Sequence, residues 1–216
     1  MKNILLLGAT GSIGDSVLSV IEQNKDSLNL YAMTLDKNVS KAKEILSTFS
    51  PKYIHIHSEE AFDQFIKSSQ SNTNAIHGNA DLNSLVCDNN IDIIVSAISG
   101  FAGLEATAIA ARTGKTVLLA NKESIVTAGE IILSSASSTG TTIIPIDSEH
   151  NAIFQCLAGE KNTNDVSKII ITASGGPFLD KKLDELKNVT KEQALQHPNW
   201  SMGSKISIDS ATLVNK

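Results

Sequence analysis

The feature that most constrains the fold of this chain is the glycine-rich segment Gly8–Gly14, which directly follows a short apolar run. The segment reads GATGSIG and comes after Ile4–Leu7. A glycine-rich turn between a buried strand and a helix is typical of dinucleotide binding, because the backbone can approach a pyrophosphate whose charge the helix N-terminus meets. The spacing GxxGxxG is a variant of the usual GxGxxG. We therefore expect a nucleotide site here, with an ordinary turn as the alternative.

Further short apolar runs predict buried strands, and segments of helical period separate them. The predicted strands are Ile4–Leu7, Leu30–Met33, Tyr53–Ile56, Ile91–Val95, Thr116–Leu119 and Thr142–Ile146, and the predicted helices are 12–23, 39–48, 59–68, 101–112 and 123–134. Strands with continuous apolar runs that alternate with helices form a parallel sheet covered on both faces. We predict an α/β fold with a doubly wound, Rossmann-like parallel sheet over residues 1–146.

The pattern changes after Pro145, and residues 147–216 predict a second module, a partial α+β catalytic domain. A helix is expected at 149–158 and a strand at Lys168–Thr172, before a Gly-Pro turn. From Lys205 the sequence predicts a strand and then the start of a helix at Asp209–Ser210. The chain stops there without a helix-capping signal.

Composition excludes several classes of partner. The chain has 18 basic and 23 acidic residues, a net charge of −5, which argues against binding to nucleic acid. It has no secretory signal and no apolar stretch of about 18 residues, so we expect no membrane partner and a cytoplasmic location. Cys87 and Cys156 are expected to be small buried residues in a reducing compartment. Arg112 is the only arginine, so a phosphate site must rely on lysines, hydroxyls and backbone amides.

The residues after the second predicted strand lie where the adenosine ribose of a dinucleotide is expected. Asp36 favours NAD, because a carboxylate binds a free ribose 2′-hydroxyl. Lys37, Asn38 and Ser40 favour NADP, because they can hold a 2′-phosphate. A solvated turn is the alternative for each of these residues.

Asn121, Lys122 and Glu123 follow a later strand, at the edge where open α/β sheets place ligands. Lysine and glutamate in succession suit a phosphorylated or carbonyl substrate and a nicotinamide ribose. The alternative is a helix start with an acidic first turn.

Asp147, Ser148 and Glu149 follow the last strand of the sheet. Carboxylates at i and i+2 point to the same side of an extended backbone, so they form half of a Mg²⁺ or Mn²⁺ site. The alternative is an N-cap and an acidic first turn for the helix that follows. His150 is expected to face solvent or the helix.

Three groups of residues in the second module carry further polar chemistry. Ser174–Phe178 offers a hydroxyl and backbone amides for an anion, with a plain turn as the alternative. His197 and Trp200, in a segment with proline, predict a loop that covers a substrate. We expect one helix face to share Ser210, Asn215 and Lys216. The other histidines, His55, His57 and His77, are expected to belong to the scaffold.

Taken in order, these motifs resemble the 1-deoxy-D-xylulose 5-phosphate reductoisomerase family from Ile4 to Lys216. The segments that carry the resemblance are GATGSIG, LANKES, IPIDSEHNAIFQ, ASGGPF and HPNWSMGSKISIDSATLVNK. The resemblance implies a homodimeric enzyme that uses NADPH and Mg²⁺ or Mn²⁺. It implies conversion of 1-deoxy-D-xylulose 5-phosphate into 2-C-methyl-D-erythritol 4-phosphate, in non-mevalonate isoprenoid biosynthesis.

The resemblance also implies roles for individual residues. The implied NADPH ligands are Gly8, Thr10, Gly11, Ser12, Ile13, Lys37, Asn38, Asn121, Glu123 and Gly203. The implied substrate contacts are Lys122, Ser148, Glu149, Ser174, His197, Ser210, Asn215 and Lys216. Asp147 and Glu149 would bind the metal, and Lys122, Asp147, Glu149 and His197 form the implied catalytic set.

The sequence departs from the family pattern in two respects. Asp36 stands where the family usually has glycine, and an acid beside a 2′-phosphate weakens the preference for NADP; we still expect NADP. The family's third metal carboxylate and its C-terminal helical domain follow the last segment of this sequence, so we expect a truncated chain that is inactive by itself. The alternatives are a dinucleotide-binding module without catalysis and a semialdehyde dehydrogenase, although neither cysteine is placed as the nucleophile that enzyme needs.

Overall fold

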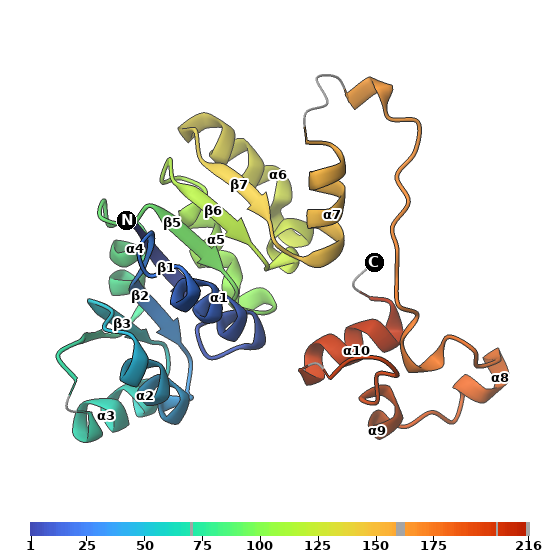
Figure 1. The fold of residues 1–216 in the computed structure, drawn as a ribbon, viewed down its shortest axis with the longest axis horizontal. Helices are drawn as coiled ribbons and strands as arrows, with labels where there is room; N and C mark the ends of the chain where they lie inside the picture. The colour runs from blue at the N-terminus through green and yellow to red at the C-terminus, as the bar shows by residue number, and fades with distance from the viewer. Residues whose placement is uncertain (70, 159–162, 202, 215–216) are drawn as a thin grey trace. The chain divides into compact units, whose positions relative to one another are not determined.

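The computed structural model describes residues 1–69, 71–158, 163–201 and 203–214. Contacts divide the chain into two compact units, Met1–Gln155 and Cys156–Lys216 (Figure 1). The boundary expected from the sequence, after residue 146, falls one residue beyond the last strand, whereas the division by contacts falls before the last residue of the helix that follows it. The two units are described separately below.

Among the described residues, the first unit is built on a seven-stranded sheet of order β4-β3-β2-β1-β5-β6-β7, in which every pairing is parallel. The strands are β1 (Lys2–Leu7), β2 (Leu28–Leu35), β3 (Tyr53–Ile56), β4 (Asn74–Ile76), β5 (Ile93–Ser96), β6 (Thr116–Leu119) and β7 (Thr142–Pro145). The chain winds outward from β1 in both directions, so the predicted doubly wound α/β fold is confirmed. The winding reverses between β1 and β5, which is where such sheets form a ligand crevice.

Helices cover both faces of this sheet (Figure 1). They are α1 (Ser12–Gln23), α2 (Val39–Thr48), α3 (Glu59–Ser68), α4 (Asn79–Val86), α5 (Leu104–Ala110), α6 (Lys122–Thr139) and α7 (Ser148–Cys156), with a 3₁₀ turn η1 (Phe101–Gly103) before α5. Ile4 and Leu6 of β1 pack in one core cluster with residues of α1, α2 and α3. Leu5 and Leu7 pack in another with residues of α4 and α5. The continuous apolar run of β1 therefore fills both cores, as its alternation of side chains requires.

The second unit contains, in the part that the structure describes, only short helices and turns. These are η2 (Thr163–Asp165), η3 (Gly176–Phe178), α8 (Leu183–Leu186), α9 (Lys191–Ala194) and α10 (Ser204–Thr212). The strand predicted at Lys168–Thr172 is wrong: no described segment pairs with it, and a strand needs the backbone groups of a neighbour. Ile170 in this run is 71% exposed.

The strand predicted from Lys205 is also wrong, because α10 already begins at Ser204. The backbone amide of Ser207 donates to the carbonyl oxygen of Gly203 at 3.0 Å. Lys205 forms an ion pair with Asp209 one helical turn later, at 2.5 Å. These local contacts outweigh the apolar alternation that favoured a strand.

Cys87 and Cys156 are both exposed free thiols, so their expected burial is wrong. Cys87 caps the C-terminus of α4 and Cys156 is the last residue of α7, and helix ends lie at the surface. In the described part of the chain, no helix has both the length and the apolar character needed to cross a membrane.

The turn after β1 depends on a close backbone approach at Gly8. Its amide donates to the Thr34 hydroxyl at 2.9 Å, and the Ala9 amide donates to the Thr34 carbonyl at 2.9 Å. Gly8 has φ +87°, and a Cβ atom there would lie 2.8 Å from the carbonyl oxygen of Ala97. Only glycine combines this backbone angle with this contact.

We predict that Gly8→Ala lowers the free energy of unfolding more than Gly78→Ala does. Gly78 has a matching φ of +91°, but a Cβ atom there would meet nothing within 4 Å. Both substitutions strain the backbone, and only Gly8→Ala adds overpacking, which costs about 1–3 kcal/mol. Urea denaturation of the two variants measures the difference. Equal destabilisation would show that the approach to Ala97 is not a constraint.

Candidate active site

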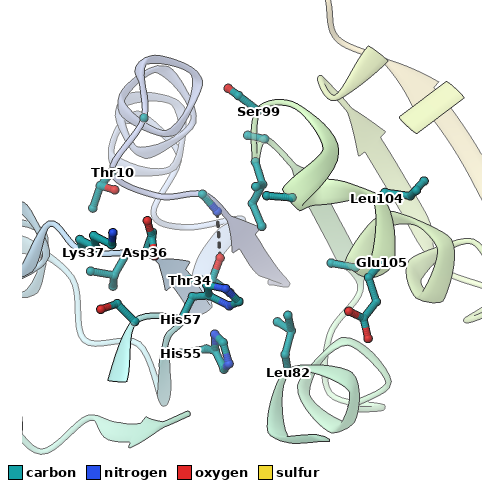
Figure 2. A pocket seen from close by; sticks show the side chains of 18 of the residues that line it. Thr10, Thr34, Asp36, Lys37, His55, His57, Leu82, Ser99, Leu104 and Glu105 are labelled. Carbon is teal, nitrogen blue, oxygen red and sulfur yellow. Dashed lines mark hydrogen bonds between the residues drawn. The ribbon is translucent and has the colours of Figure 1, made fainter. Parts of the chain in front are cut away.

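A cleft of about 1120 Å³ lies at the carboxyl edge of the sheet in the first unit. It is lined by the turn after β1, the ends of β2 and β3, the segment after β5 and the starts of α4 and α5. Figure 2 shows Thr10, Asp36 and Lys37 on one side of this cleft and Ser99, Leu104 and Glu105 on the other. The cleft is the crevice expected from the reversal of winding beside β1.

The predicted nucleotide residues of the first turn meet at this cleft. Gly8, Thr10 and Gly11 line it. Gly11 is the N-cap of α1 and makes no side-chain cap, so the first amides of α1, which begin at Ser12 and Ile13, have no side chain to accept from them. Free amides at a helix N-terminus suit a phosphate group.

Lys37 and Asn38 lie beyond the end of β2 and differ in how their side chains are engaged. Lys37 lines the cleft and is exposed, and its side chain has no hydrogen bond or ion pair with another described residue. The Asn38 side-chain oxygen accepts from the Lys41 amide at 3.0 Å and caps α2. Lys37 is therefore free to bind an anion, whereas Asn38 has only its side-chain NH₂ group available.

Asn121 is only 2% exposed, and its side chain is fully used inside the protein. Its NH₂ group donates to the carbonyl oxygens of Ile98 and Gly100. Its side-chain oxygen accepts from the amide and the hydroxyl of Ser124, at 2.7 and 2.5 Å. The side chain therefore holds the segment after β5 against the start of α6, and it positions that part of the cleft wall. Glu123 lies half-buried in the first turn of α6.

Lys122 and Asp147 form an ion pair between the first turn of α6 and the residue before α7. The Lys122 Nζ lies 2.6 Å from Asp147 Oδ2, with the two side chains 21% and 15% exposed. Asp147 Oδ1 is buried and accepts no hydrogen bond, although the His150 Nδ1 lies 3.2 Å away. The Asp147 side chain bonds to no amide of α7, so the N-cap alternative lacks its defining contact.

The residues around Asp147 fit part of a cation site. A buried carboxylate oxygen without a hydrogen bond is the kind of group that a cation satisfies. Glu149, two residues on, accepts from the Ser148 hydroxyl at 2.8 Å. Within the described residues, no cluster of three or more His, Cys, Asp or Glu side chains is placed to hold a metal ion. Asp147 and Glu149 thus offer two ligands, and other ligands would complete the shell.

The second unit brings together three of its predicted site residues. Ser174 Oγ lies 3.0 Å from His197 Nε2 and 3.0 Å from Ser210 Oγ. His197 Nδ1 accepts from the amides of Asn199 and Trp200, at 3.2 and 3.1 Å. In the neutral ring, Nε2 therefore carries the proton and donates to Ser174.

Two further features shape this cluster. The His197 ring stacks on Trp200, with centroids 5.0 Å apart and planes at 12°, in a loop between α9 and α10. A Cβ atom on Gly176 would lie 2.7 Å from the Ser210 carbonyl oxygen, so the Gly-Pro turn lies directly against α10. Gly203 is the N-cap of α10. Asn215 and Lys216 lie outside the described residues.

Two histidines expected to belong to the scaffold, His55 and His57, line the cleft. His55 and His77 do bond to backbone carbonyls, of Gly78 and Ile56 respectively. His57, however, is exposed and lines the cleft. No sequence motif marks it; only its position directly after β3 does.

Comparisons with known proteins place the chain among relatives of one kind. A family model described as 1-deoxy-D-xylulose 5-phosphate reductoisomerase matches residues 4–129, and the model of that enzyme's C-terminal domain matches residues 143–216. Proteins of that name from Clostridium tetani and from a Geobacillus species are 49% and 47% identical over the whole chain, which covers 57% and 56% of them.

Solved structures agree with these matches. A crystal structure of DOX-P reductoisomerase with NADPH, fosmidomycin and magnesium matches with a TM-score of 0.91 at 40% identity, over 100% of this chain and 55% of the other. The reductoisomerase from Zymomonas mobilis in complex with NADPH matches with a TM-score of 0.87 at 43% identity, over 99% of this chain and 55% of the other. The chain thus spans a little over half the length of these relatives.

We predict a favourable coupling of about 1–3 kcal/mol between Lys122 and Asp147. Removing either partner leaves a partly buried charge unpaired. The stability losses of the single variants Lys122→Met and Asp147→Asn should therefore add up to more than the loss of the double variant. A double-mutant cycle in urea measures this coupling. The exposed pair Lys25–Glu22, at 3.6 Å, is the control and should show a coupling near zero. A coupling no larger than that control would contradict the prediction.

Proposed function

Because the chain belongs to the 1-deoxy-D-xylulose 5-phosphate reductoisomerase family, we propose that it binds NADPH and a divalent cation for conversion of 1-deoxy-D-xylulose 5-phosphate into 2-C-methyl-D-erythritol 4-phosphate. The observation that carries the proposal is the cleft beside β1, where the glycine turn and the free Lys37 lie on the same wall. NADPH complexes among the structural relatives support the choice of cofactor. In the full-length form the family's homodimer and cytoplasmic location are part of the proposal.

The first unit supplies the cofactor site. The amides at the start of α1 bind the pyrophosphate, and Gly8 lets the backbone approach it. Lys37 faces the adenosine ribose with its 2′-phosphate. Asn121 acts through the segment after β5, which it holds in place, and Glu123 lies beside it at the start of α6.

Asp147 and Glu149 would hold Mg²⁺ or Mn²⁺, which would polarise the substrate's carbonyl and hydroxyl oxygens when bound. Lys122 keeps its ammonium group against Asp147 Oδ2, which fixes the direction of this carboxylate and leaves Oδ1 for the cation. Ser148 donates to Glu149 and restrains the second carboxylate in the same way.

The second unit supplies donors for the substrate phosphate. Ser174 and Ser210 offer hydroxyl groups in a chain with a single arginine, and His197 fixes the Ser174 hydroxyl by donating to it. We include Asn215 and Lys216 among the phosphate contacts because the resemblance to the family implies this role for them. The loop of His197 and Trp200 covers the substrate and excludes water.

A second candidate function is NADPH binding without turnover. It is favoured by one observation: the described residues place no third side-chain ligand with Asp147 and Glu149. The two candidates predict the same cofactor site and differ only in metal-dependent oxidation of NADPH.

We predict that this chain binds NADPH saturably and that Asp147→Asn weakens Mn²⁺ binding at least about tenfold without changing NADPH affinity. The reason is that Asp147 offers a cation its Oδ1, which accepts no hydrogen bond, but lines no part of the cofactor cleft. Fluorescence titration measures NADPH, and electron paramagnetic resonance measures bound Mn²⁺. Asp184→Asn, at a carboxylate that is 91% exposed, is the control and should change neither value.

Two outcomes would count against the proposal. Absence of NADPH binding would overturn the assigned cofactor site, and unchanged Mn²⁺ binding in Asp147→Asn would overturn the assigned metal ligand. Mn²⁺-dependent oxidation of NADPH in the presence of 1-deoxy-D-xylulose 5-phosphate would favour the enzyme over the module.

A further inference from the structure

Two loops at the carboxyl edge of the sheet run side by side past the ends of β2 and β3. The ladder between these strands continues beyond both of them: the His57 amide donates to the Leu35 carbonyl at 2.9 Å, and the Ser58 amide donates to the Asp36 carbonyl at 3.2 Å. This register fixes His57 and Ser58 next to Asp36. All three line the same end of the cleft as Lys37.

His57 is an unengaged polar side chain at this end of the cleft. It is exposed, and no hydrogen bond or ion pair joins its ring to another described residue. Figure 2 shows it on the same side of the cleft as Asp36 and Lys37, below Thr10 of the glycine turn. Ser58 accepts from the Ala61 amide at 3.4 Å, so its hydroxyl proton is still available. The two loops therefore present donors from both sides of Asp36.

The carboxylate of Asp36 repels a ribose phosphate, and the donors on the two loops offset this repulsion. This exposed carboxylate lines the cleft beside Lys37, where a ribose phosphate would meet like charge. A single lysine offsets one negative charge, whereas a ribose phosphate brings up to two. A further donor beside Lys37 strengthens phosphate binding, and the unengaged His57 ring supplies an N–H donor.

We propose that His57 is a specificity-determining residue for NADPH: with Lys37 it binds the 2′-phosphate of the adenosine ribose and offsets the carboxylate of Asp36. This inference rests on the proposed function, since it assumes that the cleft binds the cofactor. The sequence alone assigned only the loop after β2 to the ribose, and this inference adds the loop after β3.

The neighbouring histidines cannot take this role. His55 is 1% exposed, its Nε2 lies 3.0 Å from the Gly78 carbonyl oxygen, and burial lowers its pKa, which favours the neutral ring. His77 Nδ1 lies 2.7 Å from the Ile56 carbonyl oxygen, and its ring stacks on Phe62 with centroids 5.4 Å apart. Both rings are engaged within the protein, and His57 is the histidine left to a ligand at this cleft.

The test measures the dissociation constants of NADPH and NADH for this chain and for His57→Gln under one set of conditions. His57→Gln should lower NADPH affinity about five- to tenfold and leave NADH affinity unchanged. Asp36→Asn should shift the NADPH-to-NADH affinity ratio in the opposite direction, toward NADPH.

Lys67→Gln is the control, because it removes a positive charge from the last turn of α3, the helix that follows His57 and Ser58, at a residue that does not line the cleft. It should leave the NADPH-to-NADH affinity ratio as in the parent chain. An unchanged ratio in His57→Gln, or an equal loss of both cofactors, would overturn the role of His57 while the proposed function stands. Failure of the parent chain to bind NADPH would overturn both.

Discussion

Backbone atoms that belong to β2, β1 and the segment after β5 approach one another closely where β1 ends. The rest of the site depends on this close approach. The turn after Leu7 is bound on one side to Thr34 of β2 and on the other to Ala97, whose amide donates to the Leu7 carbonyl at 3.0 Å. There is no room for a side chain at Gly8. Because the turn is held from both sides, α1 starts at the cleft and its free amides line one wall.

The same parallel sheet gathers the remaining chemistry at one edge. Parallel strands connected by helices all end on the same side, so the residues that follow β2, β3, β6 and β7 need no sequence proximity to serve one function. Lys37 and His57 follow β2 and β3, Lys122 follows β6, and Asp147 follows β7. In the first unit, the proposed cofactor specificity and cation binding thus both depend on strand register.

The sequence predicted the strands that contain a buried or partly buried apolar run. It did not predict features that depend on how strands pair. All six strands predicted for the first unit are present, as β1, β2, β3, β5, β6 and β7, because each contains a short apolar run. The seventh strand, β4, is a three-residue edge strand with Asn74 and has no such run. The run Lys168–Thr172 has the composition of a strand but no partner strand among the described residues, so the prediction from its composition alone was wrong. His57 belongs to no motif, and it becomes a candidate only when the register of β3 on β2 places it beside Asp36. Asn121 was found by motif, but its burial and its four hydrogen bonds were not foreseeable.

The central claim is that one edge of the first unit's sheet binds the cofactor and that the adjacent loops after β2 and β3 bind its 2′-phosphate. Hydrogen–deuterium exchange of this chain with saturating NADPH and with saturating NADH tests it most directly. Both cofactors should slow exchange at residues 8–14 and 97–101, and NADPH should add protection over NADH only at residues 36–38 and 57–58. Protection confined to residues 163–201, or a difference between the cofactors that spares both loops, would contradict the account.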